Sequence, residues 1–144
     1  MSMQAQFRDL LKSDIAPLLR AHGIKGSGQN YALPSASHWA LIGIQKSTYS
    51  NAEQIKFTIN LYVVSRSVWA KERELRSYFP PKPTANVYWQ IGWSMRIGTL
   101  LPGGQDYWWS FDRQTNTGDL VQSVVDAIIT KALPVMRQQL QKDK

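Results

Sequence analysis

Apolar and polar residues alternate with a period of two in the middle of the chain. Residues 55–63 carry apolar side chains at every odd position, and residues 40–44 carry small aliphatic side chains at even positions. A period of two is typical of a strand with one buried face. Residues 39–64 are therefore predicted to form a central hairpin, with a loop at residues 47–54.

The parity of these positions restricts how the two strands pair. A slip of one residue would turn one apolar set out of the core, so the numbers of facing residues must sum to an odd value. With the loop at residues 47–54, Ile44 is predicted to face Phe57, and Ile42 to face Ile59.

Further strands are predicted on both sides of the hairpin. Residues 29–33 form a short first strand after a turn at residues 25–28, and residues 107–111 form a fifth. The clearest alternation lies in the fourth strand, residues 87–97, with one face formed by Val87, Trp89, Ile91, Trp93, Met95 and Ile97.

Helical spacing of apolar residues occurs at both ends of the chain. Residues 7–19 predict a helix that ends at Gly23, and Pro17 should kink or split it near residues 13–14. Residues 120–140 predict a long helix that begins after Asn116 or Thr117 and is bent or divided near Pro134. A short helix is predicted at residues 65–77, and the proline-rich residues 78–83 end it.

This order of elements favours an α+β fold. Strands close in sequence pair antiparallel, and two amphipathic helices each need an apolar surface on which to bury one stripe. The expectation is a two-layer, single domain over residues 1–144. It has an antiparallel sheet of about five strands and N- and C-terminal helices packed on one face.

Composition narrows the chemistry. The chain has 144 residues, no cysteine and two histidines, so we expect no disulfide, no metal site and no cofactor. The formal net charge of +7 invites a nucleic-acid interpretation, but the basic residues are spread along the chain and mixed with acidic ones. The start of the chain resembles neither a signal peptide nor a membrane span, so we expect a cytoplasmic protein without membrane attachment.

Several short motifs fall in an order that resembles one family. They are Gly23-Ile24, Gln45-Lys46-Ser47, Phe57-Thr58-Ile59-Asn60-Leu61, Arg96-Ile97-Gly98, Leu101-Pro102 and Trp108-Trp109. In this order the chain resembles the largely bacterial family catalogued as domain of unknown function 4304. The resemblance covers most of the chain, except residues 66–83. It implies a small stand-alone domain with no established activity, substrate or cofactor.

Polar residues gather on the non-core face of the predicted sheet. Together with flanking aromatic residues they give the candidate binding residues Gln45, Lys46, Ser47, Asn60, Tyr62, Ser94, Arg96 and Trp108. One interpretation is a shallow pocket in which amides and a guanidinium bind an anionic or peptide-like group. The other is structural: Gln45 and Asn60 bond to loop backbone, and Arg96 pairs with a carboxylate such as Asp106.

Other functional classes have less support. Five aromatic residues could stack on bases, but core and rim packing also explains them: Trp39, Tyr62, Tyr88, Trp108 and Trp109. His22 is expected to serve the end of the first helix, and His38 is expected at the surface. Asp106, Asp112 and Asp119 gather in the last loop region, where acidic residues commonly act as helix caps.

The sequence thus favours a non-enzymatic ligand- or protein-binding module that uses the polar sheet face. A weak nucleic-acid-binding protein and an uncharacterised hydrolase or transferase are the alternatives. A homodimer is compatible with the pattern, and neither a partner nor a ligand is specified.

Overall fold

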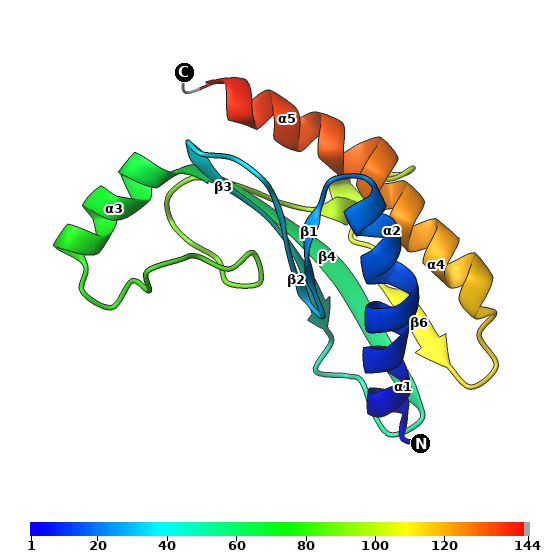
Figure 1. Ribbon diagram of the computed structural model, residues 1–144. Helices are drawn as coiled ribbons and strands as arrows, with labels where there is room; N and C mark the ends of the chain where they lie inside the picture. The colour runs from blue at the N-terminus through cyan, green and yellow to red at the C-terminus, as the bar shows by residue number, and fades with distance from the viewer. Residues whose placement is uncertain (143–144) are drawn as a thin grey trace.

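The computed structural model describes residues 1–142, which form an antiparallel sheet with helices on both sides (Figure 1). The elements in chain order are α1 (Met3–Leu10), η1 (Leu11–Ile15), α2 (Ala16–Ala21), β1 (Lys25–Ser27), β2 (Asn30–Leu33), β3 (His38–Lys46), β4 (Gln54–Ser65), α3 (Arg66–Leu75), β5 (Trp93–Arg96), η2 (Ile97–Leu100), β6 (Trp109–Asp112), α4 (Thr117–Asp126), η3 (Ala127–Ala132) and α5 (Leu133–Lys142). The predicted α+β class, with an antiparallel sheet and helices at both ends, is confirmed.

The sheet is built around β4. Its order is β1-β2-β3-β4-β5, and β6 also pairs with β4. β5 and β6 share one edge of that long strand, because β6 pairs with residues 54–57 and β5 with residues 60–63. The strand missing from the prediction is β1, which pairs with β2 where the sequence suggested only a turn.

The register of the central hairpin corrects the prediction by two residues. Ile44 pairs with Ile59 and Ile42 with Leu61, so the parity is as expected but the loop is longer. Side-chain hydrogen bonds hold residues 50–56 in the loop region: Asn51 Oδ1 accepts from the amides of Glu53 and Gln54 at 2.8 and 3.0 Å. Parity alone could not exclude this register, because a shift of two keeps every side chain on its face.

Both long helices are interrupted just before a proline. Pro17 follows the π-helical η1, in which the Ala16 amide donates to the Leu11 carbonyl, and Pro134 follows the π-helical η3, in which the Leu133 amide donates to Ile128. A proline has no amide donor and crowds the preceding turn, and a wider turn accommodates it. The predicted interruptions are confirmed at both places.

The main core lies between the sheet and the terminal helices (Figure 1). Phe57 of β4 is its centre, with ring centroids 5.0 Å from Phe7 of α1 and 5.7 Å from Trp109 of β6. Odd residues 55–63 of β4 and even residues 40–44 of β3 face this core, as their alternation predicted.

The opposite face of the sheet has a smaller apolar cluster of its own, here called the second cluster. Its buried members are Leu41, Tyr62, Val64, Trp69 and Phe79. Trp69 of α3 stacks on Phe79 with ring centroids 4.9 Å apart, and Trp89 contacts the Trp69 ring edge-on. α3 and residues 76–92 therefore cover part of a face that the two-layer prediction left open (Figure 1).

The predicted strand at residues 87–97 is wrong over its first half. Only residues 93–96 form a strand, because Gly92 at φ +84° turns the chain between Ile91 and Trp93. Trp89 and Ile91 pack against the second cluster, whereas Trp93 packs against the main core. The alternating apolar residues of 87–97 thus pack against two different cores, one on each face of the sheet.

Candidate functional site

A row of paired residues crosses the second face of the sheet near its centre. Asn30 of β2 pairs with Gly43 of β3, Gly43 with Asn60 of β4, and Asn60 with Arg96 of β5. Directly paired residues present their side chains on the same face. These four residues are here called the polar row.

The side chains around the row bond to one another. Asn60 Nδ2 donates to Gln45 Oε1 at 2.7 Å, and Arg96 Nε donates to Asn60 Oδ1 at 3.1 Å. Arg96 Nη2 also reaches Gln45 Oε1 at 3.4 Å. A guanidinium can only donate, so it fixes both amides with their oxygens toward it.

Gly43 makes room for a residue from outside the sheet. A Cβ at position 43 would lie 2.3 Å from Asn86 Oδ1, so only glycine lets the Asn86 side chain lie flat on β3. There Asn86 Nδ2 donates to the Ile44 carbonyl at 3.1 Å, and its Oδ1 accepts from Asn60 Nδ2 at 3.0 Å. Asn86 thereby fastens residues 82–88 to the sheet.

The far side of Arg96 is held by the loop before β6. Arg96 Nη1 lies 3.2 Å from Asp106 Oδ2, and Trp108 Nε1 donates to the same oxygen at 2.9 Å. The Trp108 ring centroid lies 5.2 Å from the guanidinium carbon. The acidic side chain of Asp106 and the aromatic side chain of Trp108 thus orient the arginine at the edge of the sheet.

Two further contacts position that loop. A Cβ at Gly98 would lie 2.4 Å from the Gln105 carbonyl oxygen, so the glycine permits close packing of the loop backbone. The hydroxyl of Thr58, which is fully buried, donates to the Tyr107 carbonyl at 2.7 Å. The backbone on either side of Asp106 is therefore fixed, at Gln105 by the packing against Gly98 and at Tyr107 by the hydrogen bond from Thr58.

Gln45, Asn60, Asn86 and Arg96 line a hollow of about 360 Å³ together with Val87, Tyr88 and Ser94. Among the described residues, every amide oxygen around it already accepts a hydrogen bond, whereas Gln45 Nε2 and the Ser94 hydroxyl have no partner. Arg96 also has N–H groups beyond the three that bond. The hollow therefore offers mainly donors.

Residues 15–138 match the family described as Domain of unknown function (DUF4304). The chain belongs to this family. Comparison with curated proteins and comparison with solved structures each give no match. The resemblance inferred from the sequence is confirmed, and it assigns no activity to the domain.

The DUF4304 domain brings together five of the eight candidate residues. Gln45, Asn60, Ser94 and Arg96 line one hollow, and Trp108 lies beside Arg96. Of the structural interpretation, the pairing of Arg96 with Asp106 is present. The expected bonds of Gln45 and Asn60 to loop backbone are not present within residues 1–142, because these amides bond to each other and to the side chains of Asn86 and Arg96.

The other three candidates lie elsewhere in the DUF4304 domain. Lys46 Nζ donates to Gln4 Oε1 of α1 at 2.9 Å, and Ser47 Oγ accepts from the Tyr49 amide in the loop. Tyr62 is buried in the second cluster and donates to the Ile91 carbonyl at 2.7 Å. Burial raises the pKa of its phenol.

Asn86 is the site residue that sequence reasoning missed. It lies just before residues 87–97, which the sequence predicts to be a strand, and far along the chain from Gly43. The available signal was Gly43 itself, since a glycine inside a strand often marks a close approach of another backbone or side chain.

The aromatic residues do not gather into a stacking surface. Trp109 is buried in the main core and Tyr62 in the second cluster, while Tyr88 is 78% exposed. Trp39 is half-buried, with the Arg66 guanidinium 3.8 Å from its ring centroid. Their positions match the packing interpretation.

The expectation of a surface position for His38 is wrong. The side chain is 2% exposed, and its Nδ1 lies 2.7 Å from Ser37 Oγ. The beginning of α3 lies close to it, since Arg66 Nε donates to the His38 carbonyl at 3.3 Å. His22 lies at the end of α2 as predicted, with Nδ1 3.0 Å from the Leu18 carbonyl.

The three aspartates of the last loop region have separate roles. Asp106 pairs with Arg96, Asp112 accepts from the Gln114 amide at 2.8 Å, and Asp119 lies in the first turn of α4 behind the Asn116 cap. Within residues 1–142, no group of three histidine, aspartate or glutamate side chains is placed to hold a metal ion. In the same range, no helix has the length and apolar character to cross a bilayer.

Proposed function

We propose that this domain is a binding module whose site is the hollow around Asn60 and Arg96. Its ligand is a small molecule with a carboxylate and a neighbouring carbonyl group. The observation that carries the proposal is the surplus of donors, because Gln45 Nε2, the remaining Arg96 N–H groups and the Ser94 hydroxyl surround one hollow of about 360 Å³. That volume is within the range of small-molecule sites.

The arrangement supports a rigid, prepared site. Arg96 is held by Asn60, Asp106 and Trp108, so little side-chain freedom is lost when a carboxylate binds its open edge. A planar guanidinium offers a carboxylate two parallel donors, which a lysine cannot do.

The same geometry favours binding over catalysis. The polar groups around the hollow are amides, the hydroxyls of Tyr88 and Ser94, and an arginine whose charge is balanced by Asp106. Neither histidine lines it. General acid–base catalysis most often uses histidine, aspartate or glutamate, and none of these is among the described residues that line the hollow.

The test is titration of the ¹⁵N-labelled protein with N-acetylglycine, which carries both acceptor groups. We expect shifts of the amide signals of residues 45, 60, 86 and 94–96. Arg96→Gln should weaken binding about tenfold or more, since hydrogen bonds to charged groups contribute about 1.5–3 kcal/mol. Arg96→Lys should recover only part of the affinity.

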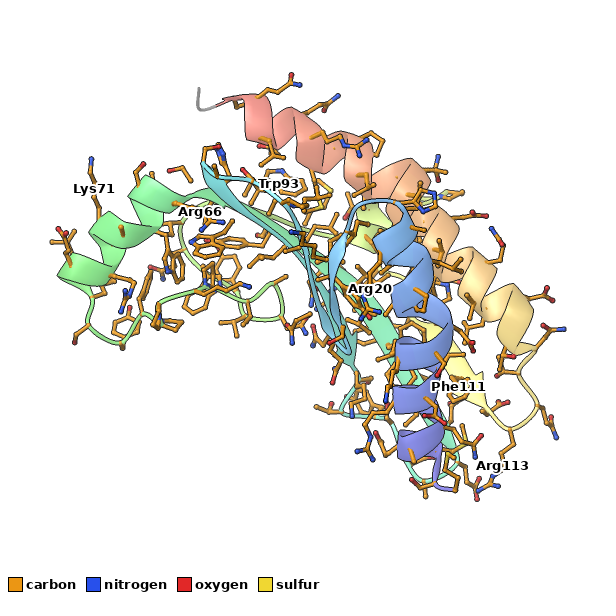
Figure 2. All side chains as sticks on the ribbon, viewed as in Figure 1. Arg20, Arg66, Lys71, Trp93, Phe111 and Arg113 are labelled. Carbon is orange, nitrogen blue, oxygen red and sulfur yellow. The ribbon has the colours of Figure 1, made fainter. Side chains whose placement is uncertain are left out.

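Arg113→Gln is the matched control. Arg113 is an exposed arginine in the loop after β6 (Figure 2), and it does not line the hollow. Its loss should therefore leave the affinity unchanged. An Arg96→Gln protein that binds N-acetylglycine as tightly as the unchanged protein would remove the basis of the proposal.

The proposal also includes a cytoplasmic location and a single domain, both of which rest on the sequence expectations. Fractionation of cells that produce the protein tests the first. Limited proteolysis tests the second, because a single cooperative unit should resist cleavage except near its ends.

A further inference from the structure

A second row of paired residues lies beside the polar row on the same face of the sheet. Lys25 of β1 pairs with Ala32 of β2, and Ala32 pairs with Leu41 of β3. Their side chains share one face, as those of direct cross-strand pairs do. Ala32 is the small residue of this row, just as Gly43 is the small residue of the polar row.

The two small residues have different surroundings. Asn86 fills the space above Gly43, whereas a hollow of about 290 Å³ lies above Ala32. Leu41 and Pro83 contribute apolar walls to this hollow, and Thr84 and Ala85 complete its far side. Ala85 also borders the hollow at Arg96, so residues 82–88 separate the two.

Two lysines stand on opposite sides of the hollow. Lys25 comes from the edge strand β1, and Lys82 comes from the segment after α3. The Lys82 ammonium lies 5.5 Å from the ring centroid of Trp39, a cation–π contact that restricts its position. Within residues 1–142, neither ammonium forms an ion pair with a carboxylate.

The sequence explains why these charges are not neutralised. Residues 15–52 and residues 75–105 contain no aspartate or glutamate, although the whole chain has 10. These two stretches supply every residue that lines the hollow. Two positive charges therefore face a partly apolar hollow whose walls hold no negative charge.

We infer that this hollow is a second binding site, for a small molecule in which an anionic group is attached to an apolar body. Lys25 and Lys82 attract the anionic group, and Ala32, Leu41 and Pro83 contact the apolar body. The inference does not rest on the proposed function, because the two hollows share only the border at Ala85.

The probe is octanoate, added to the ¹⁵N-labelled full-length protein. We expect amide shifts at residues 25–32, 41–42, 82, 84 and 85. Acetate lacks the apolar body and octanamide lacks the charge, so both should bind at least about fivefold more weakly than octanoate.

Three variants locate the site. Lys25→Gln with Lys82→Gln should raise the dissociation constant of octanoate at least about fivefold, because two charges are lost at a partly exposed site. Ala32→Trp should fill the hollow and abolish the shifts. Arg113→Gln, which removes an arginine that lines neither hollow, is the control and should leave octanoate binding unchanged.

Each contrary result overturns the inference. Octanoate that binds the double lysine variant as tightly as the unchanged protein would show that the lysines do not recognise the charge. Shifts that persist in Ala32→Trp, or octanamide that binds as tightly as octanoate, would place the ligand elsewhere or make the contact purely apolar. The absence of any shift at millimolar octanoate would exclude the site.

Discussion

The two faces of the sheet are built from different kinds of residue. On the face under the terminal helices, Ile44, Phe57 and Ile59 are 0% exposed and pack against helices at both ends of the chain. The other face carries the small second cluster, and beside it lie amides, an arginine and two hollows. The first face holds the fold together, and this leaves the second face available for polar and concave surfaces.

The covering chain differs in the same way. The main core is covered by long helices, whereas the second face is covered by α3 and the largely irregular residues 76–92 (Figure 1). On α3, Lys71 points away from the rest of the molecule, and Arg66 lies at the base of the helix (Figure 2). Irregular segments on a rigid scaffold are where binding residues commonly occur.

The largest expected difference between the faces is in stability. Phe57→Ala should lower the free energy of unfolding by about 3–5 kcal/mol, because it opens a cavity in a fully packed core. Phe79→Ala, in the second cluster, should lower it by about 2 kcal/mol, since that smaller cluster lies close to the surface. Urea denaturation measures both, and equal losses would show that the two faces contribute alike.

A smaller effect is expected at the point where the covering chain is fastened. Gly43→Ala places a methyl group against Asn86 Oδ1 and should cost about 1–3 kcal/mol. In an Asn86→Ala background, most of this loss should disappear, because the obstructing atoms are gone.

Gly118→Ala is the control for that experiment. Its Cβ would lie 3.4 Å from the nearest atom, Asn116 Oδ1, and position 118 is in the first turn of α4. The substitution should be neutral or slightly stabilising. An undiminished loss for Gly43→Ala in the Asn86→Ala background would contradict the placement of Asn86 on β3.

The buried tyrosines allow the faces to be compared by pH. Burial raises the pKa of Tyr31, which packs in the main core, from 10.0 to about 12, with Arg20 partly opposing the shift. The folded protein therefore keeps its phenol proton where the unfolded chain has lost it. The Tyr31 phenol thus leaves the free energy of unfolding unchanged below pH 10 and lowers it as the pH rises from 10 through 12.

The variants Tyr31→Phe and Tyr62→Phe separate the two contributions. Each should show a shallower loss of stability above pH 10 than the unchanged protein, as measured by denaturation at a series of pH values. Tyr62→Phe should also be less stable at neutral pH, because the Ile91 carbonyl loses its donor. Variants with the same alkaline slope as the unchanged protein would rule out this account.

The smallest effect on stability is expected at the polar row. The Arg96 and Asp106 side chains are 38% and 50% exposed, so Arg96→Gln should change the free energy of unfolding by about 1 kcal/mol or less. Thermal denaturation tests this. A loss as large as that of Phe57→Ala would make Arg96 a structural residue and would weaken the binding proposal.

Much of the first face could be predicted from the sequence. The alternation in β3 and β4 fixed which side chains are buried, and Gly23 ends α2, with the Ile24 amide donating to the Leu19 carbonyl. These features depend on local pattern and on short-range backbone geometry, which a single sequence records.

The second face was harder to predict because its contacts are long-range. Gly43 and Asn86 meet across more than forty positions, and nothing in the residues between them indicates the contact. The alternation of residues 87–97 also suits a strand, and only the turn at Gly92 divides it between two cores. Gln45, Asn60 and Arg96 were found because they belong to regular strands.

The fastening of residues 82–88 by Asn86 has a consequence for how this domain can change. This segment forms one wall of each hollow, yet none of its residues belongs to the main core. Substitutions there can reshape both hollows while the main core stays as it is. A library confined to residues 82–85 and 87–88, with Asn86 kept, therefore varies one wall of each hollow without changing a residue of the main core.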